Sequence, residues 1–139
     1  MAANTTPIFI KQGNFTPARI AAANTASDGS GTLVTLVTAV TDGTRVDGVR
    51  FINSQATAAI SGAKVLRIFL SDTGGINSRL IGEVVMATAT RSTTAIGATS
   101  IYTFDQAIVM KSGQLMSVCM SVYVGVQDQT DAIAYAGDY

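Results

Sequence analysis

The sequence predicts an all-β protein: a two-sheet, jelly-roll-like β-sandwich of about eight strands, preceded by an extended N-terminal arm. Short segments rich in Val, Ile and Thr recur between Gly- and Asp-containing turns, which is typical of strands. No helix-length amphipathic segment occurs along the chain. Two sheets packed face to face are expected, because a single sheet of this many strands leaves one face bare.

The clearest strand signal lies in residues 113–125. Every second residue from Met116 to Val124 is apolar, and the residues between them, including Ser117 and Cys119, are mostly small. Because side chains on a strand alternate between faces, this pattern predicts one long strand with one face in a core. The small second face predicts a close neighbour there, either another subunit or a covering loop.

The other elements follow from turn residues and alternation. Residues 72–75 read Asp-Thr-Gly-Gly and predict a hairpin between the strands on either side. A tight turn is expected at Asp42-Gly43, and Gly48 is a candidate bulge site. Residues 54–63, 87–98 and 126–130 are expected to be loops. The strands expected besides 113–125 are 17–21, 32–40, 45–53, 64–71, 78–86, 100–110 and 131–139.

Two parts are expected, an arm over residues 1–30 and a β-sandwich domain over residues 31–139. The first thirty residues hold an apolar patch that includes Phe9, surrounded by Gly, Asn, Thr and Pro. Such an arm either closes one edge of a sheet or reaches across a neighbouring subunit. Phe9 is therefore a candidate interface residue.

The charge of the chain is low and balanced. Nine basic and nine acidic residues make up 13% of the 139 residues, about half of the usual share. No basic run indicates a nucleic-acid partner, and no apolar run has the length of a membrane span. The start of the chain lacks the features of a secretion signal, so synthesis in a host cytoplasm is expected. A weakly charged surface suits contact with other proteins.

The residues needed for common catalytic sites are missing. The chain has no His, which rules out Ser-His-Asp and Cys-His arrangements and removes the usual zinc ligand. The single Cys119 has no disulfide partner within the chain and is expected to be a small buried residue. Gly74-Gly75 falls in a turn rather than in a phosphate-binding loop. We therefore predict no catalytic residues, no cofactor and no metal.

Two acidic alternatives are weaker. Residues 128–131 place Asp128 and Asp131 close together, a poor calcium-site pattern that is more typical of a solvated loop. A hydrolase would need two of Asp105, Asp128 and Asp131 in one cleft. Nothing in the sequence brings two of these acids together.

Further interface candidates lie in one predicted strand and at the last residue. Arg45, Asp47 and Arg50 cluster within a few positions and are expected to form salt links with a neighbouring strand or subunit. The last residue, Tyr139, is expected to be either disordered or docked through its ring and carboxylate.

Several stretches resemble a known family. They are residues 42–51 (DGTRVDGVRF), 67–70 (RIFL), 80–84 (LIGEV) and the ending 137–139 (GDY). In these the chain resembles the small β-sandwich structural virion proteins of tailed bacteriophages, of the head decoration or cement type. The resemblance runs from about residue 32 to the last residue and leaves out the arm.

The resemblance implies a capsid decoration protein, commonly a homotrimer, on the outside of the virion head where subunits of the major capsid protein meet. The partners it implies are the major capsid protein and other copies of this chain. The alternative is a tail, fibre or vertex module that binds another virion protein or a cell-surface glycan. For a glycan, the available stacking residues are Tyr102, Tyr123, Tyr135 and Tyr139.

Overall fold

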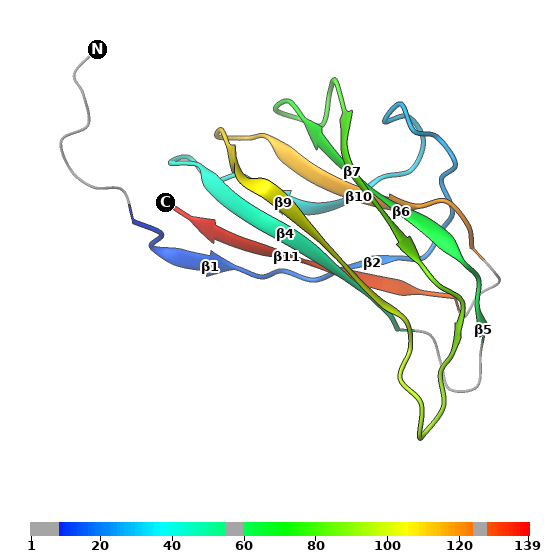
Figure 1. The fold of residues 1–139 in the computed structure, drawn as a ribbon. Coiled ribbons are helices and arrows are strands. Elements are labelled where there is room, and N and C mark those ends of the chain that lie inside the picture. The colour runs from blue at the N-terminus through cyan, green and yellow to red at the C-terminus, as the bar shows by residue number, and fades with distance from the viewer. Residues whose placement is uncertain (1–8, 55–59, 124–127) are drawn as a thin grey trace, which may run out of the picture.

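The computed structural model describes residues 9–54, 60–123 and 128–139. In this part of the chain the secondary structure is β-strand without helix, and two antiparallel sheets pack face to face (Figure 1). The predicted two-sheet β-sandwich is confirmed.

Sheet A has five strands and sheet B has four, and a two-stranded ribbon joins two of the connections. Sheet A contains β1 (Gln12–Asn14), β2 (Ala18–Ile20), β11 (Thr130–Asp138), β4 (Thr44–Asn53) and β9 (Thr99–Met110). Sheet B contains β3 (Val34–Thr38), β10 (Leu115–Met120), β6 (Lys64–Ser71) and β7 (Arg79–Met86). The ribbon consists of β5 (Ile60–Ser61) and β8 (Ala89–Thr90).

The order of the strands is that of a jelly roll. β1 and β2 pair with opposite ends of β11 and together form one interrupted edge strand. With these two counted as one, sheet A has the order β1/β2-β11-β4-β9 and sheet B has the order β3-β10-β6-β7. Between the two sheets, the chain changes sheet at every step except the predicted β6–β7 hairpin. The first strands, β1 and β2, pair with the last strand, β11.

The core lies between the sheets and follows the alternation along each strand. Val46, Val49 and Phe51 of β4 point inward, as do Leu66 and Ile68 of β6. Small alanine side chains of β11, the neighbour of β4 in sheet A, also point inward. The remaining buried members of the core cluster are Ile20, Leu36, Val37, Ala39, Met86, Met110, Met116, Val118, Met120, Ala132, Ala134 and Ala136.

The long strand predicted over residues 113–125 is shorter in the structure. β10 ends at Met120. Residues 124–125, the end of the predicted strand, lie outside the described residues. The pairing with β3 stops at Val118, and only an isolated bridge from Ala23 follows at Met120. Alternation alone does not reveal where the partner strand ends, so it overestimated the length of this strand.

The small second face of β10 is covered by residues 21–33. Asn24 donates its backbone N–H to the backbone oxygen of Met120 at 2.8 Å, and its own backbone oxygen lies 3.8 Å from the Sγ atom of Cys119. Arg67 donates to the backbone oxygens of Asn24 and Thr25. Of the two alternatives, the structure places a covering loop there. Cys119 is 1% exposed, and burial raises the pKa of its thiol.

The bulge predicted at Gly48 is present. The register of β4 against β9 shifts between Val46, opposite Ile108, and Gly48, opposite Thr103. A Cβ atom at Gly48 would lie 2.6 Å from the backbone oxygen of Tyr102, so glycine is required by this close approach.

Two predicted loops contain an element that the sequence did not reveal. β5 lies within residues 54–63 and β8 within residues 87–98, and they pair over two residues each. Segments this short carry no readable alternation, so the prediction of uninterrupted loops was wrong at these positions. Residues 55–59 of the first loop and 126–127 of the loop before β11 lie outside the described residues.

Candidate functional site

The outer face of sheet A carries exposed apolar side chains that no other element of the described residues covers. We call this set the apolar face: Ile10, Phe15, Ile101, Val109 and Tyr135, which are 46%, 57%, 53%, 62% and 38% exposed. A group of exposed large apolar side chains on one sheet is the usual mark of an interaction surface.

Strand alternation places most of this face. In β11, Ala134 and Ala136 point into the core, so Tyr135 between them points outward. In β9, Ile101 lies opposite Arg50 and Val109 opposite Arg45, and both arginines point away from the core. The same alternation that builds the core therefore directs these apolar side chains outward, beside the two arginines.

Ile10 and Phe15 reach the face by packing on glycines. Gly13 of β1 and Gly137 of β11 are directly paired. A Cβ atom at Gly13 would lie 2.3 Å from the ring of Phe15, and one at Gly137 would lie 2.5 Å from Ile10. The two bare positions are thus filled by side chains from the start of the chain. Sequence reasoning missed these residues because the pairing of β1 with β11 has no local signal.

The predicted cluster of charged residues on β4 is only partly paired. Arg45 and Asp47 form an ion pair at 2.7 Å within the strand rather than with a neighbour, and both are about half exposed. The hydrogen bond from Arg45 to Asp47 and the charge of Asp47 raise the pKa of Arg45. Arg50 is exposed and makes no hydrogen bond or ion pair with the residues that the structure describes. It is therefore free to meet a partner.

The other two predicted interface residues behave differently. Phe9 is 74% exposed and is one of the first described residues. Tyr139 is half-buried and docked: its backbone N–H donates to the backbone oxygen of Gly43 at 3.1 Å, and its ring lies over that glycine. Beside it, Asp138 accepts hydrogen bonds from Thr44 at 2.6 Å and from Asn14 at 3.2 Å.

A second ion pair holds the opposite end of the same face. Arg19 of β2 donates to Asp131 of β11 at 2.9 Å. Burial raises the pKa of Asp131, but the hydrogen bond and charge of Arg19 and the charge of Arg91 outweigh burial, and the pKa is lowered. Asp131 is thus part of a structural pair.

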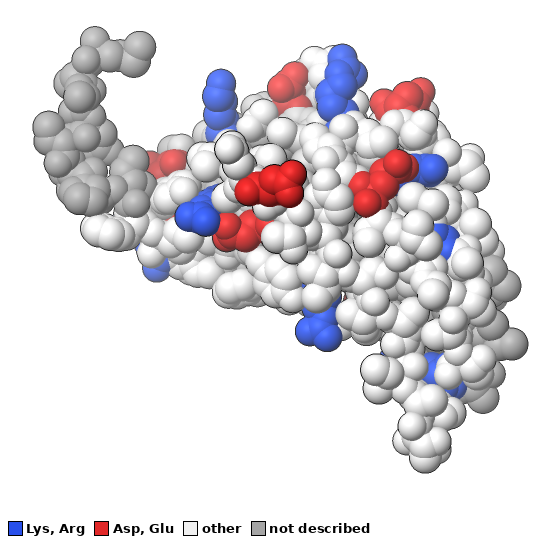
Figure 2. Space-filling view, viewed as in Figure 1, with Lys and Arg blue, Asp and Glu red and all other residues white. Residues whose placement is uncertain are grey.

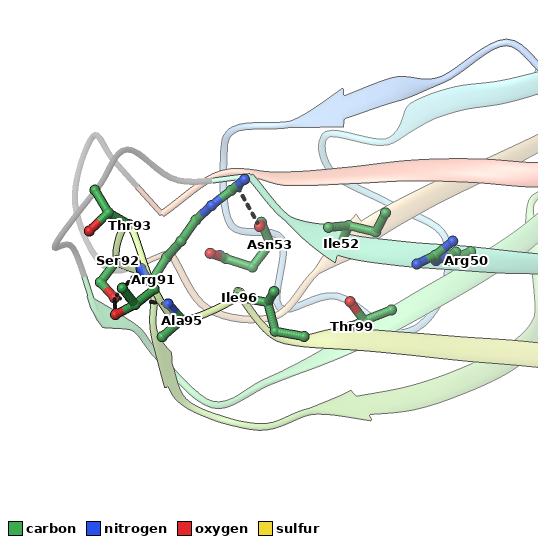
Figure 3. Close-up of a pocket in the computed structure, with 11 residues that line it drawn as sticks. Arg50, Ile52, Asn53, Arg91, Ser92, Thr93, Ala95, Ile96 and Thr99 are labelled. Atoms are coloured by element: carbon green, nitrogen blue, oxygen red, sulfur yellow. Dashed lines mark hydrogen bonds between the residues drawn. The ribbon is translucent and has the colours of Figure 1, made fainter.

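A solvent-open hollow of about 420 Å³ lies between the loop before β9 and the end of β4 (Figure 3). Arg91 reaches across it and donates to the backbone oxygen of Asn53 at 3.3 Å, whereas Arg50 lies at the other end. The lining residues that the structure describes include Ser and Thr hydroxyls but no carboxylate, Cys or His, so no usual general base lies beside those hydroxyls. The lining residues are Arg50, Ile52, Asn53, Arg91, Ser92, Thr93, Thr94, Ala95, Ile96, Gly97 and Thr99.

The residues that the structure describes contain no cluster of three or more His, Cys, Asp or Glu side chains of the kind that holds a metal ion. Asp128 is 1% exposed, so the expectation that it lies in a solvated loop was wrong. It contacts Lys64, while Asp131 contacts Arg19. The two acids of the weak calcium pattern therefore serve separate ion pairs.

Charges are scattered rather than gathered on the face that Figure 2 shows. Figure 2 shows a largely uncharged surface on which acidic and basic side chains are interspersed. Among the described residues there is no helix of sufficient length and hydrophobicity to span a bilayer. No family model matches the chain, and a search of curated proteins finds no match either.

Proposed function

We propose that this protein is a structural virion protein of a tailed phage, a capsid decoration protein that binds the outside of the head through the apolar face of sheet A. The observation that supports the proposal most is that face itself: a group of exposed apolar side chains on a sheet whose other side is the core. The family resemblance of residues 42–51 supplies the kind of partner, the major capsid protein.

The composition of the face fits a stable protein interface. Tyr135 and Phe15 offer aromatic rings, and Arg50 offers an exposed guanidinium; such residues carry much of the binding energy at interfaces. A standard interface buries about 800 Å² on each partner. The ion pairs Arg45–Asp47 and Arg19–Asp131 lie on the outward side of the same sheet and add polar contacts among the apolar side chains.

The proposed role needs no chemistry from this chain. A protein that clamps the junctions between capsid subunits stabilises the lattice by binding the assembled form and not the separated one. A rigid sandwich suits this role, because little conformational entropy is lost when a preformed face binds. We propose a homotrimer on the head surface and no catalytic activity, as the resemblance implies.

The glycan-binding alternative has less support on the surface. Of the four tyrosines, Tyr135 is exposed, whereas Tyr102, Tyr123 and Tyr139 are half-buried. Tyr102 packs over Gly82, and its hydroxyl donates to the backbone oxygen of Ile81 at 3.4 Å. A single exposed ring is a small platform for stacking a sugar.

The test is cryo-electron microscopy of the virion that contains this protein, with its copies counted against the major capsid protein. We expect many copies ordered on the head lattice, with the apolar face turned toward the capsid. Copies confined to the tail or a vertex would overturn the decoration role and favour the alternative. Absence from purified virions would overturn both.

A further inference from the structure

Three side chains from distant parts of the sequence meet in the dry interior at one end of the sandwich. The Nζ atom of Lys64 contacts the Oδ1 atom of Asp128, and both side chains have no solvent exposure. Asn53 is also fully buried, and its Nδ2 atom lies 3.3 Å from the same Oδ1 atom. One carboxylate oxygen therefore contacts an amine nitrogen and an amide nitrogen at the same time.

The three residues come from both sheets. Lys64 is the first residue of β6 in sheet B, and Asn53 is the last residue of β4 in sheet A. Asp128 precedes β11 of sheet A. Asn53 is held in place by a second hydrogen bond, from Nδ2 to the backbone oxygen of Gln129 at 3.1 Å. Its Oδ1 atom is buried without a hydrogen-bond partner.

As an ion pair alone, this arrangement is unfavourable in free energy. Burying two charges costs several kcal/mol for each ion, and pairing them repays this cost only in favourable cases. The unpaired Asn53 oxygen adds a further cost, because buried polar atoms are rarely left without a partner. An amine, a carboxyl group and an amide brought together without water are, however, the parts needed to form an amide bond between side chains.

We infer that Lys64 and Asn53 form an intramolecular isopeptide bond, with Asp128 as the group that moves the proton. The inference is independent of the proposed function. The Lys64 ammonium first gives a proton to the Asp128 carboxylate, which leaves a neutral amine and a carboxylic acid. The amine lone pair attacks Cγ of Asn53, and the C=O electrons move to Oδ1.

The intermediate then collapses with loss of ammonia. The attacking nitrogen loses its remaining extra proton to the carboxylate after Asp128 has protonated Nδ2, and the Cγ–Nδ2 bond breaks. The departing ammonia takes the last proton from Asp128, so the products are an Nζ–Cγ amide, one ammonium ion and Asp128 again as the carboxylate, and the step needs no oxidant or other reactant. The contact of one Asp128 oxygen with both nitrogens is the geometry that this transfer from nucleophile to leaving group requires.

Exclusion of water serves the same step, because no solvent competes with the amine. The product joins the end of β4 to the start of β6 and so links the two sheets covalently. It closes the chain between Asn53 and Lys64 and restricts the unfolded state, as a disulfide does.

The test is the intact mass of the purified full chain, measured after denaturation. We expect a mass lower than that calculated from the sequence by one ammonia. Trypsin does not cleave after an acylated lysine, so residues 51–67 are expected as one peptide, also lighter by one ammonia, with no fragment ions from breaks between Asn53 and Lys64. The variant Lys64→Arg is expected to have its full calculated mass, and Lys111→Arg, at an exposed lysine, to keep the loss.

Each other result overturns the inference. The full calculated mass in the folded wild-type chain means that no bond forms. Loss of ammonia that persists in Lys64→Arg means that Asn53 cyclises with its own backbone. Loss of water, with residues 51–67 joined to a second peptide, means that Asp128 is the acceptor in place of Asn53. If Lys64→Arg does not fold, the tryptic peptide of the wild-type chain still decides the matter.

Discussion

The amine of Lys64 and the carboxylate of Asp128 contact each other where neither side chain reaches solvent. Lys64 belongs to sheet B, and Asp128 lies directly before the last strand of sheet A. This contact, with Asn53 beside it, places a buried polar link between the two sheets at one end of the apolar core. Its energetic role can be separated from its proposed chemistry.

Removing one member of the pair is expected to destabilise the fold strongly. Asp128→Asn leaves the Lys64 amine buried without its carboxylate, and we expect a loss of about 3–5 kcal/mol in the free energy of unfolding. The double variant Lys64→Met, Asp128→Asn removes both charges and is expected to be more stable than Asp128→Asn alone. Urea unfolding, monitored by circular dichroism, measures the stability of the single and the double variant. Equal stability of the two variants would contradict a buried charge as the cause.

The apolar face is expected to be sensitive to charge. Val109→Glu places a carboxylate on the outer face of sheet A, and we expect capsid binding to weaken by more than about tenfold. Val85→Glu is the matched control, because Val85 is 68% exposed on the outer side of sheet B. Co-sedimentation with capsids lacking this protein measures both. Equal weakening by the two variants would argue against the face.

The loop over β10 is expected to control access to Cys119. Asn24 holds this loop through hydrogen bonds from Nδ2 to the backbone oxygens of Ser30 and Thr32, at 2.8 and 3.0 Å. Asn24→Ala is expected to lower the free energy of unfolding by about 1–3 kcal/mol. It is also expected to speed the reaction of Cys119 with a thiol reagent under native conditions, because the loop opens more often. Asn77→Ala, in an exposed turn, is the control and is expected to leave the rate unchanged.

The contact between Gly82 and Tyr102 is expected to be intolerant of a methyl group. A Cβ atom at Gly82 would lie 2.7 Å from the ring of Tyr102, which also packs edge-on against Phe104 at 5.2 Å. Gly82→Ala is expected to lower the free energy of unfolding by about 1–3 kcal/mol, because the added methyl group overpacks this contact. In a Tyr102→Ala background the same change is expected to cost less, since the clash is gone. Thermal unfolding of the four proteins checks this, and an equal cost in both backgrounds would contradict it.

The Arg19–Asp131 pair is expected to make stability depend on pH. The pKa of Asp131 is lower in the folded state than its usual value of about 3.9. Its contribution is therefore present above the unfolded pKa and is lost as pH falls through the folded pKa. We expect Arg19→Gln to be less stable than wild type at neutral pH, with a gap that narrows below about pH 4. Urea unfolding of both proteins at neutral pH and below about pH 4 measures this difference in stability. A difference that stays the same in acid would contradict the prediction.

Local sequence predicted much of the fold. The turn at residues 72–75 and the alternation on both sides identified the β6–β7 hairpin, because both signals act between neighbours in the chain. Gly48 was identified as a bulge site from glycine within a strand pattern. The burial of Cys119 followed from its place in an alternating run.

The candidate site was less accessible to such reasoning. Arg45, Asp47 and Arg50 were identified as interface candidates in one strand, but the pairing of Arg45 with Asp47 within that strand was not. Ile10 and Phe15 reach the apolar face only because β1 pairs with β11, whose residues lie more than a hundred positions away. Asp128 carried the local signal of a polar loop, yet it is buried against Lys64.

The sequence by itself determined the class of the fold, the hairpin, the main turns and the scarcity of groups for common catalysis. These depend on backbone preference, side-chain alternation and residue inventory, which are properties of short segments. Tertiary structure alone decided the jelly-roll order, the length of β10, the apolar face and the meeting of Lys64, Asp128 and Asn53. Each of these results from which distant strands pair and which sheet each strand joins, and such contacts leave no mark on the residues next to them in the chain.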